Sequence, residues 1–172
     1  MKITRPIRAV LFDMDGVMVD SEFVYMKYLL EFAKEKNPAV KMEDINPMVG
    51  RSRQDSWTVM EQAVNNGENW ETLIREWADR DIYSQIDYRK IFRPEMKTTV
   101  QELKRRGYIV ALVSSTGPKL ISRIVEEVGM RPEFDLIVSG KQFKQSKPNP
   151  EIYHYTADTL GIREDECFVV ED

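Results

Sequence analysis

The sequence predicts an α/β protein built on a doubly wound parallel sheet, with an α-helical domain inserted into it. Short apolar runs at 7–12, 108–113, 134–138 and 167–170 are typical of strands buried on both faces. Amphipathic helical patterns lie between the last three runs, which indicates successive strand–helix–strand units. The segment 19–91 holds helical patterns and no convincing buried strand. Together these observations favour a parallel sheet interrupted by helices.

The helical segment follows the first predicted strand directly. Its three apolar patterns with helical spacing lie at 21–36, 52–66 and 68–85. Asn-Pro and Asn-Gly pairs, which favour turns, separate these patterns. We therefore predict that this segment is a helical insertion between the first and second strands of the core.

The domain organisation follows from this order of elements. Residues 1–18 and 92–172 are expected to form a discontinuous Rossmann-like core, and residues 19–91 a separate helical domain. A chain of 172 residues can bury a core of this size and carry one insertion.

The core helices have recognisable ends. Pro94 is expected to open one helix at its first position, and Gly107 to end it after a basic last turn. The segment 119–129 has apolar residues three and four apart. A further helix follows Pro150 and is closed by Gly161.

Composition excludes several functional classes. Charged residues make up 31% of the chain and the net charge is −4, so there is no basic footprint for nucleic acid. The single cysteine, Cys167, permits no intramolecular disulfide and no cysteine-based metal site, which favours a reducing, cytoplasmic location. The N-terminal apolar run ends at Asp13 and is too short for a signal peptide or a membrane span, so we expect no membrane partner.

Polar residues follow the ends of all four predicted strands. The carboxyl ends of parallel strands meet at one edge of a sheet, where ligands bind in open α/β folds. Carboxylates, hydroxyls and one lysine are therefore expected to converge there. These residues are Asp13 and Asp15, Ser114 to Thr116, Lys147, and Glu171 with Asp172.

This set of side chains suits phosphoryl chemistry. Clustered carboxylates repel one another unless a cation lies between them, and Mg²⁺ prefers oxygen ligands. Hydroxyls and a lysine bind phosphate well. One aspartate carboxylate can attack phosphorus, and a second can act as general acid and then base. A lysine and a metal ion would offset the charge of the transition state.

Four motifs resemble those of the haloacid dehalogenase-like (HAD) superfamily. They are similar to the motifs of β-phosphoglucomutase-like enzymes and small phosphatases that carry a helical cap. The resemblance covers nearly the whole chain, and the order of the four motifs makes it specific. The motifs are DMDGV at 13–17, VSST at 113–116, SKPNPEIY at 146–153 and FVVED at 168–172.

The resemblance implies a role for each residue at the sheet edge. Asp13 matches the nucleophile and a metal ligand, and Asp15 matches the general acid/base with its backbone carbonyl on the metal. Lys147 matches the lysine that neutralises the nucleophile and the phosphate. Asp172 matches an acidic metal ligand, and Glu171 is a neighbouring acid expected to assist it. Mg²⁺ is the implied cofactor.

Phosphate and substrate binding are also implied by the resemblance. Ser114 matches the phosphate-binding hydroxyl, and we group Ser115 and Gly16 with it. The hydroxyls after the second strand are also expected to cap the next helix. In the inserted segment, GRSRQDS at 50–56 resembles the substrate loop of the mutases, where Arg53 matches an arginine that binds a distal phosphate.

The expected activity is Mg²⁺-dependent hydrolysis of a small phosphorylated metabolite, such as a sugar phosphate. The second aspartate, Asp15, favours phosphoryl transfer, because dehalogenase members of the superfamily lack it. A β-phosphoglucomutase-type mutase is the alternative. Tyr25 speaks against the mutase, because the mutases place a histidine at this position of the first cap helix.

The last predicted strand, 167–170, ends the sequence with Glu171 and Asp172. Members of the superfamily normally continue with a helix, another strand and a final helix. We therefore expect the C-terminal part of the core to be missing and strand 167–170 to be an edge with an uncovered apolar face. An inactive fragment or a phosphate-binding module is accordingly a second alternative, and the oligomeric state stays open.

Overall fold

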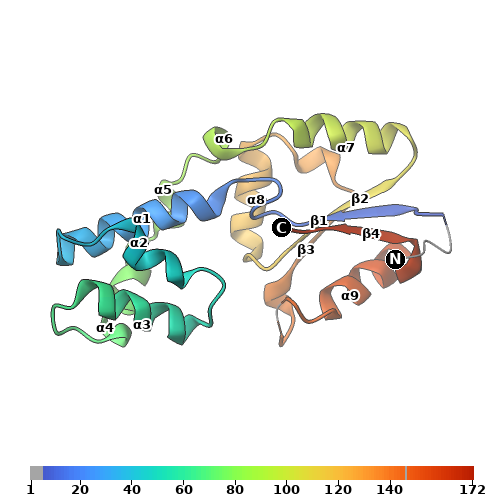
Figure 1. The fold of residues 1–172 in the computed structure, drawn as a ribbon. Helices are drawn as coiled ribbons and strands as arrows, with labels where there is room; N and C mark the ends of the chain where they lie inside the picture. The colour runs from blue at the N-terminus through green and yellow to red at the C-terminus, as the bar shows by residue number, and fades with distance from the viewer. Residues whose placement is uncertain (1–5, 146) are drawn as a thin grey trace. The chain divides into compact units, whose positions relative to one another are not determined.

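The chain forms two compact units. The structure, a computed structural model, describes residues 6–145 and 147–172 (Figure 1). One part, here called the α/β unit, comprises the described residues up to Ser21 together with Asp87–Asp172. The helical unit comprises Glu22–Ile86. It lies inside the segment 19–91 that the sequence assigns to a separate domain.

The α/β unit contains a four-stranded sheet in the order β3-β2-β1-β4. All three strand pairs are parallel, which confirms the predicted sheet. The strands are β1 (Ala9–Phe12), β2 (Ile109–Ser114), β3 (Leu136–Ser139) and β4 (Cys167–Val170).

Burial explains which strands lie at the centre. All four residues of β1 and all but the first residue of β2 are buried, as expected for continuous apolar runs between two helical layers. In β4, Phe168 is 50% exposed and Val169 is 39% exposed. Within the described residues β4 pairs only with β1, so the predicted edge strand with an uncovered apolar face is confirmed.

Helices pack on the sheet from both sides. In Figure 1, α7 (Glu95–Arg105) lies above the sheet and α9 (Glu151–Leu160) below it. Ile152 and Ala157 of α9 join the buried cluster formed by alternate residues of the central strands. The third long helix of the unit is α8 (Pro118–Glu127).

Helix boundaries follow the predicted signals closely. Pro118 is the first residue of α8, and Gly161 ends α9 with a left-handed φ of 63°. Pro94 differs from the prediction, because it caps α7 from outside and Glu95 is the first helical residue. The short helix α6 (Tyr88–Ile91) leads the chain back into the α/β unit.

All three helical patterns of the inserted segment form helices. Helix α1 (Ser21–Lys36) matches its pattern, and α3 (Arg53–Val64) is slightly shorter than predicted. The third pattern, 68–85, is divided between two helices, α4 (Trp70–Ala78) and α5 (Ile82–Gln85). The break occurs at Asp81, whose φ of 43° is left-handed and cannot continue a right-handed helix.

Short elements complete both units. Helix α2 lies in the helical unit, together with one of the four 3₁₀ turns found in the described residues. No helix in the described part of the chain is both long and apolar enough to cross a membrane. The remaining bounds are α2 (Met42–Ile45), η1 (Asn46–Met48), η2 (Arg131–Glu133), η3 (Gly140–Gln142) and η4 (Glu164–Glu166).

The chain leaves and re-enters the α/β unit at one place. Val19 forms an antiparallel bridge with Phe92. The backbone N–H of Asp20 donates to the carbonyl of Ile91 at 2.8 Å, and the N–H of Arg93 donates to that of Met18 at 3.0 Å. The two connections to the inserted segment therefore run side by side.

Candidate active site

The strand ends of the sheet bring the predicted residues together. Phe12 at the end of β1 lies opposite Val170 of β4, so Asp13 and Glu171 emerge side by side. The backbone N–H of Asp13 donates to the carbonyl of Val170 at 2.9 Å, which extends the pairing by one residue. On the other side, Ser114 of β2 lies opposite Ser139 of β3.

Lys147 lies at the centre of this edge. Its Nζ donates to Asp13 Oδ1 at 2.9 Å, to Glu171 Oε1 at 2.7 Å and to the carbonyl of Val113 at 2.6 Å. One ammonium group thus links both acidic strand ends with the neighbouring strand. Its three protons match these three acceptors, so its position is fixed.

The Asp13 side chain is buried, with 9% of its surface exposed, and this burial affects its pKa. Burial raises the pKa of Asp13 above its usual value, and the hydrogen bond and charge of Lys147 offset part of this rise. The negative charge of Glu171 adds to the rise. An ionised Asp13 is therefore best stabilised when cationic charge is present beside it.

Tyr153 is a site residue that the sequence analysis did not single out. It lies in the first turn of α9, and its hydroxyl donates to Glu171 Oε1. The Lys147 ammonium lies 5.5 Å from the centre of its ring. Burial and then Glu171 raise the pKa of Tyr153, so its hydroxyl stays protonated as a donor. Its place in the SKPNPEIY motif was the available signal.

Asp15 is held by two hydroxyl groups. Ser21 Oγ donates to Asp15 Oδ1 at 2.5 Å, and Thr116 Oγ1 donates to Asp15 Oδ2 at 2.9 Å. Ser21 is the second residue that sequence reasoning missed, because its interest depends on a contact across the turn after β1. Both carboxylate oxygens of Asp15 therefore have a fixed donor.

Gly16 allows the tight turn that follows Asp15. Its φ of 74° is one that residues with side chains rarely adopt. A Cβ on Gly16 would also collide with the carboxylate of Asp172. A side chain at this position would therefore strain the backbone and displace the carboxylate of Asp172.

The hydroxyls after β2 are arranged differently from a helix cap. Ser114 is fully buried, and its Oγ accepts a hydrogen bond from the backbone N–H of Thr116 at 3.0 Å. Ser115 is half-buried at the same edge, close to Gly140. Helix α8 has Gly117 at its N-cap and no side-chain cap, so the capping prediction for these hydroxyls is wrong.

Three carboxylates form a possible metal site. Oxygen atoms of Asp13, Glu171 and Asp172 all lie within 4.8 Å of one another. A set of oxygen donors without sulfur or imidazole suits a hard divalent cation such as Mg²⁺. The side chain of Asp15 is not one of the three groups, so any contribution of Asp15 would come from its backbone.

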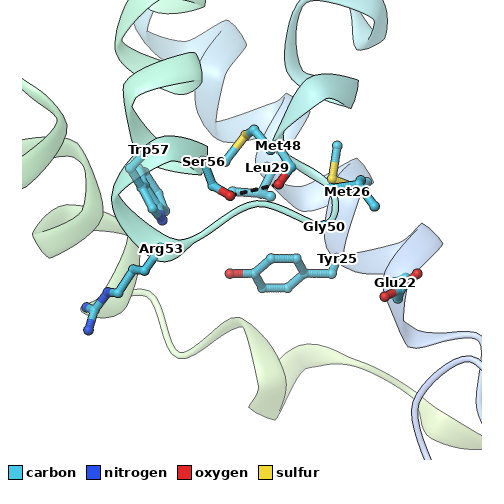
Figure 2. Close-up of a pocket in the computed structure, with 10 residues that line it drawn as sticks. Glu22, Tyr25, Met26, Leu29, Met48, Gly50, Arg53, Ser56 and Trp57 are labelled. Atoms are coloured by element: carbon cyan, nitrogen blue, oxygen red, sulfur yellow. Dashed lines mark hydrogen bonds between the residues drawn. The ribbon is translucent and has the colours of Figure 1, made fainter. Parts of the chain in front are cut away.

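The helical unit contributes a separate pocket, which includes Arg53. Figure 2 shows Arg53 and Trp57 of α3 on one side and Tyr25 of α1 on the other. The pocket has a volume of about 250 Å³. Its lining residues are Glu22, Tyr25, Met26, Leu29, Met48, Val49, Gly50, Arg53, Ser56 and Trp57.

Polar and aromatic groups define this pocket. Arg53 and Glu22 form no salt bridge within the described residues of either unit. Tyr25, in contrast, is fixed: its hydroxyl accepts a hydrogen bond from Trp77 Nε1 at 2.9 Å, and its ring stacks on that of Tyr83. The pocket thus combines a rigid aromatic wall with two charged groups that remain available.

Several sequence relatives of the chain carry phosphatase names. Hexitol phosphatase B of Escherichia coli (strain K12) is 25% identical over 174 residues, covering 100% of this chain and 78% of that protein. A phosphatase of phosphorylated carbohydrates from Thermotoga maritima is 24% identical over 169 residues, covering 96% of this chain and 76% of that protein.

Solved structures show the same fold. A β-phosphoglucomutase from Clostridium difficile superposes with a TM-score of 0.67 at 22% identity, covering 96% of this chain and 76% of that one. The sequence profile of the haloacid dehalogenase-like hydrolases matches residues 10–172. The matched segment includes Asp13, Asp15, Glu171 and Asp172. The chain therefore belongs to the haloacid dehalogenase-like hydrolase family.

Proposed function

We propose that the chain is a Mg²⁺-dependent phosphatase that hydrolyses a small phosphorylated metabolite, such as a sugar phosphate, through an aspartyl-phosphate. The observation that carries this proposal is the position of Lys147, which bonds to Asp13 and Glu171 at the end of the sheet. This arrangement supports attack by Asp13 on a phosphoryl group whose charge the lysine offsets. The named phosphatases among the relatives support the same reaction class.

Two aspartates divide the chemistry between them. In the first step, a carboxylate oxygen of Asp13 bonds to phosphorus, the bond from phosphorus to the leaving oxygen breaks, and Asp15 gives that oxygen a proton. In the second step, Asp15 takes a proton from water as the water oxygen bonds to phosphorus. The bond between phosphorus and the Asp13 carboxylate oxygen breaks in the same step, which regenerates the Asp13 carboxylate and releases inorganic phosphate.

The phosphoryl group needs donors in addition to Lys147. The Ser114 hydroxyl accepts from the backbone N–H of Thr116, and within the described residues its own proton has no acceptor, so it would donate to a phosphoryl oxygen. Asp13, Glu171 and Asp172 would hold Mg²⁺, together with the carbonyl of Asp15. When bound, Mg²⁺ supplies positive charge that offsets the phosphoryl oxygens.

The pocket of the helical unit would select the rest of the substrate. Arg53 offers a guanidinium without a salt-bridge partner in the described chain, which suits a second anionic group. The half-buried Tyr25 would offer apolar surface in the pocket wall against which a sugar ring can pack.

A mutase is the second candidate, and the unpaired Arg53 favours it. A mutase must hold a bisphosphate intermediate while the sugar turns over, which a cationic group in the helical unit would assist. The fixed Tyr25 favours the phosphatase, because both its hydroxyl and its ring already have partners within the helical unit. Product analysis with glucose 1-phosphate separates the two: glucose 6-phosphate identifies a mutase, and free phosphate a phosphatase.

The proposed function is tested by a screen of sugar, polyol and nucleoside phosphates, with Mg²⁺ or with EDTA. Wild-type chain should release phosphate only with Mg²⁺, and Asp13→Asn should lower kcat by at least about 10³-fold. Asp158→Asn, an exposed aspartate on α9, is the matched control and should retain wild-type turnover. Full turnover by Asp13→Asn would refute the proposal.

A further inference from the structure

Thr116 makes a contact that its local sequence does not explain. It lies between β2 and α8, where a threonine hydroxyl would ordinarily cap the helix. Its Oγ1 instead donates to Asp15 Oδ2 at 2.9 Å, across 101 positions of sequence. Helix α8 begins without any side-chain cap. The hydroxyl of Thr116 is therefore committed to Asp15.

The backbone of Thr116 is fixed on both sides. Its N–H donates to Ser114 Oγ at 3.0 Å, and its carbonyl accepts from Ser139 Oγ at 2.6 Å. Ser114 and Ser139 end β2 and β3 and lie opposite each other in the sheet. The backbone of Thr116 is thus hydrogen-bonded to the ends of both β2 and β3. These bonds hold its hydroxyl in place beside Asp15.

The second oxygen of Asp15 is held independently. Ser21 Oγ, at the start of α1, donates to Asp15 Oδ1 at 2.5 Å. Ser21 and Thr116 belong to segments far apart in sequence, and they approach the carboxylate at different oxygens. Two such bonds restrict rotation about the side chain of Asp15. Removing one leaves the carboxylate free to turn about the other.

We propose that Thr116 is a positioning residue that orients Asp15 toward the leaving oxygen of the substrate. This inference rests on the proposed function, in which Asp15 is the general acid/base. Thr116 contacts no reacting atom and acts only through Asp15. Ser139 supports it from β3. The threonine after the second strand thereby acquires a role distinct from the phosphate-binding hydroxyl of Ser114.

A positioning role has a signature that a structural role lacks. Proton donation to the leaving oxygen matters most for a poor leaving group and least for a good one. Phenyl phosphate and p-nitrophenyl phosphate have nearly the same shape, but phenol, like tyrosine, has a pKa of about 10 and nitrophenol is far more acidic. The value of kcat/KM includes the step in which this group leaves.

The experiment compares wild type, Thr116→Val and Thr116→Ser on the two esters in the presence of Mg²⁺. Thr116→Val keeps both backbone bonds and removes the hydroxyl. It should lower kcat/KM about tenfold for phenyl phosphate and less than about threefold for p-nitrophenyl phosphate. Thr116→Ser should restore both values to near wild type. Thr159→Val, which removes an exposed threonine hydroxyl on α9, is the matched control and should change neither value.

Each outcome discriminates between the two hypotheses. Equal losses on both esters, or no loss on either, would overturn the role of Thr116 and leave the phosphatase intact. A failure of Thr116→Ser to restore phenyl phosphate turnover would also overturn it, provided that thermal unfolding shows both variants folded. Absence of wild-type turnover on either ester, or turnover that survives Asp13→Asn, would overturn the proposed function and this inference together.

Discussion

The strand-end site of the α/β unit and the pocket of the helical unit are built on opposite principles. At the strand ends, Lys147 bonds to two carboxylates and a carbonyl, and both oxygens of Asp15 accept hydroxyl protons. In the helical unit, Arg53 and Glu22 line a pocket without a salt bridge to any described residue.

This difference separates two tasks. Groups that stabilise a transition state act best when they are fixed in advance, because no energy is then spent on reorientation. Groups that recognise a substrate remain available until the substrate supplies their partners. The difference fits the proposal that the paired site carries out catalysis, and that the pocket, whose two charged groups have no salt bridge within the described residues, selects the substrate.

Replacement of Lys147 is expected to have the largest effect on this comparison. Lys147→Met should lower kcat by about 10²- to 10³-fold, because it removes the fixed cation from the phosphoryl site. It also leaves Asp13 and Glu171 as neighbouring acids without their shared donor. The measurement is steady-state kinetics on p-nitrophenyl phosphate with saturating Mg²⁺.

Lys119→Met is the control, because Lys119 is an exposed lysine in the first turn of α8. It should behave as wild type. If Lys147→Met retained kcat within about threefold, the paired network would be structural rather than catalytic.

Replacement of Arg53 tests the other half of the comparison. Arg53→Gln should raise KM about tenfold for a substrate with a second anionic group, with little change in kcat, because the interaction is the same in ground and transition states. It should leave p-nitrophenyl phosphate unaffected. Arg51→Gln, two residues away and outside the pocket lining, is the matched control. An equal loss for Arg53→Gln on both substrates would contradict selection by the pocket.

The smallest expected effect is that of replacing Glu102. Like the Lys147 ammonium, its carboxylate has several charged hydrogen-bond partners, Arg105 and Arg106, but it lies on the surface, away from the strand-end site. Arg105 and Arg106 hold the pKa of Glu102 at about 2, below its usual 4.5. A lowered carboxyl pKa adds stability above about pH 4.5, and this stability is lost as the pH falls toward 2.

Glu102→Gln should therefore be slightly less stable than wild type at neutral pH, and the difference should shrink between about pH 5 and pH 3. Urea unfolding across this range measures it, with Glu126→Gln on α8 as the control. A difference that stays constant with pH would show that the arginine pairs do not stabilise the fold. Phosphatase activity should not change. That result would show that hydrogen-bonded charge pairs outside the strand-end site do not contribute to catalysis.

Much of the α/β unit could be predicted from sequence. Four short apolar runs specify strands buried between helices, and parallel pairing then places the residues after each strand at one edge. The roles of Asp13, Asp15 and Lys147 remain predictions that the arrangement supports. The break of the pattern 68–85 at Asp81 was missed, because a single left-handed residue leaves little trace in apolar spacing.

The contacts that sequence reasoning missed are those made across long separations. Tyr153 and Ser21 acquire their partners only when the loops after β1 and β4 are placed in three dimensions. Thr116 was noted for its position, but local chemistry favoured a helix cap over a bond to Asp15. Side-chain direction in loops depends on tertiary packing, which no local pattern encodes.

The paired connections at Val19 and Phe92 have a consequence for how such proteins diversify. The segments that leave and re-enter the α/β unit are bonded to each other at Val19 and Phe92. These bonds do not depend on the residues of the inserted segment. Exchange of the segment between these two points alters the substrate pocket without shifting the register of the sheet. Under the proposed function, recombination at this junction would change the residues that select the substrate and leave Asp13 in its place at the end of β1.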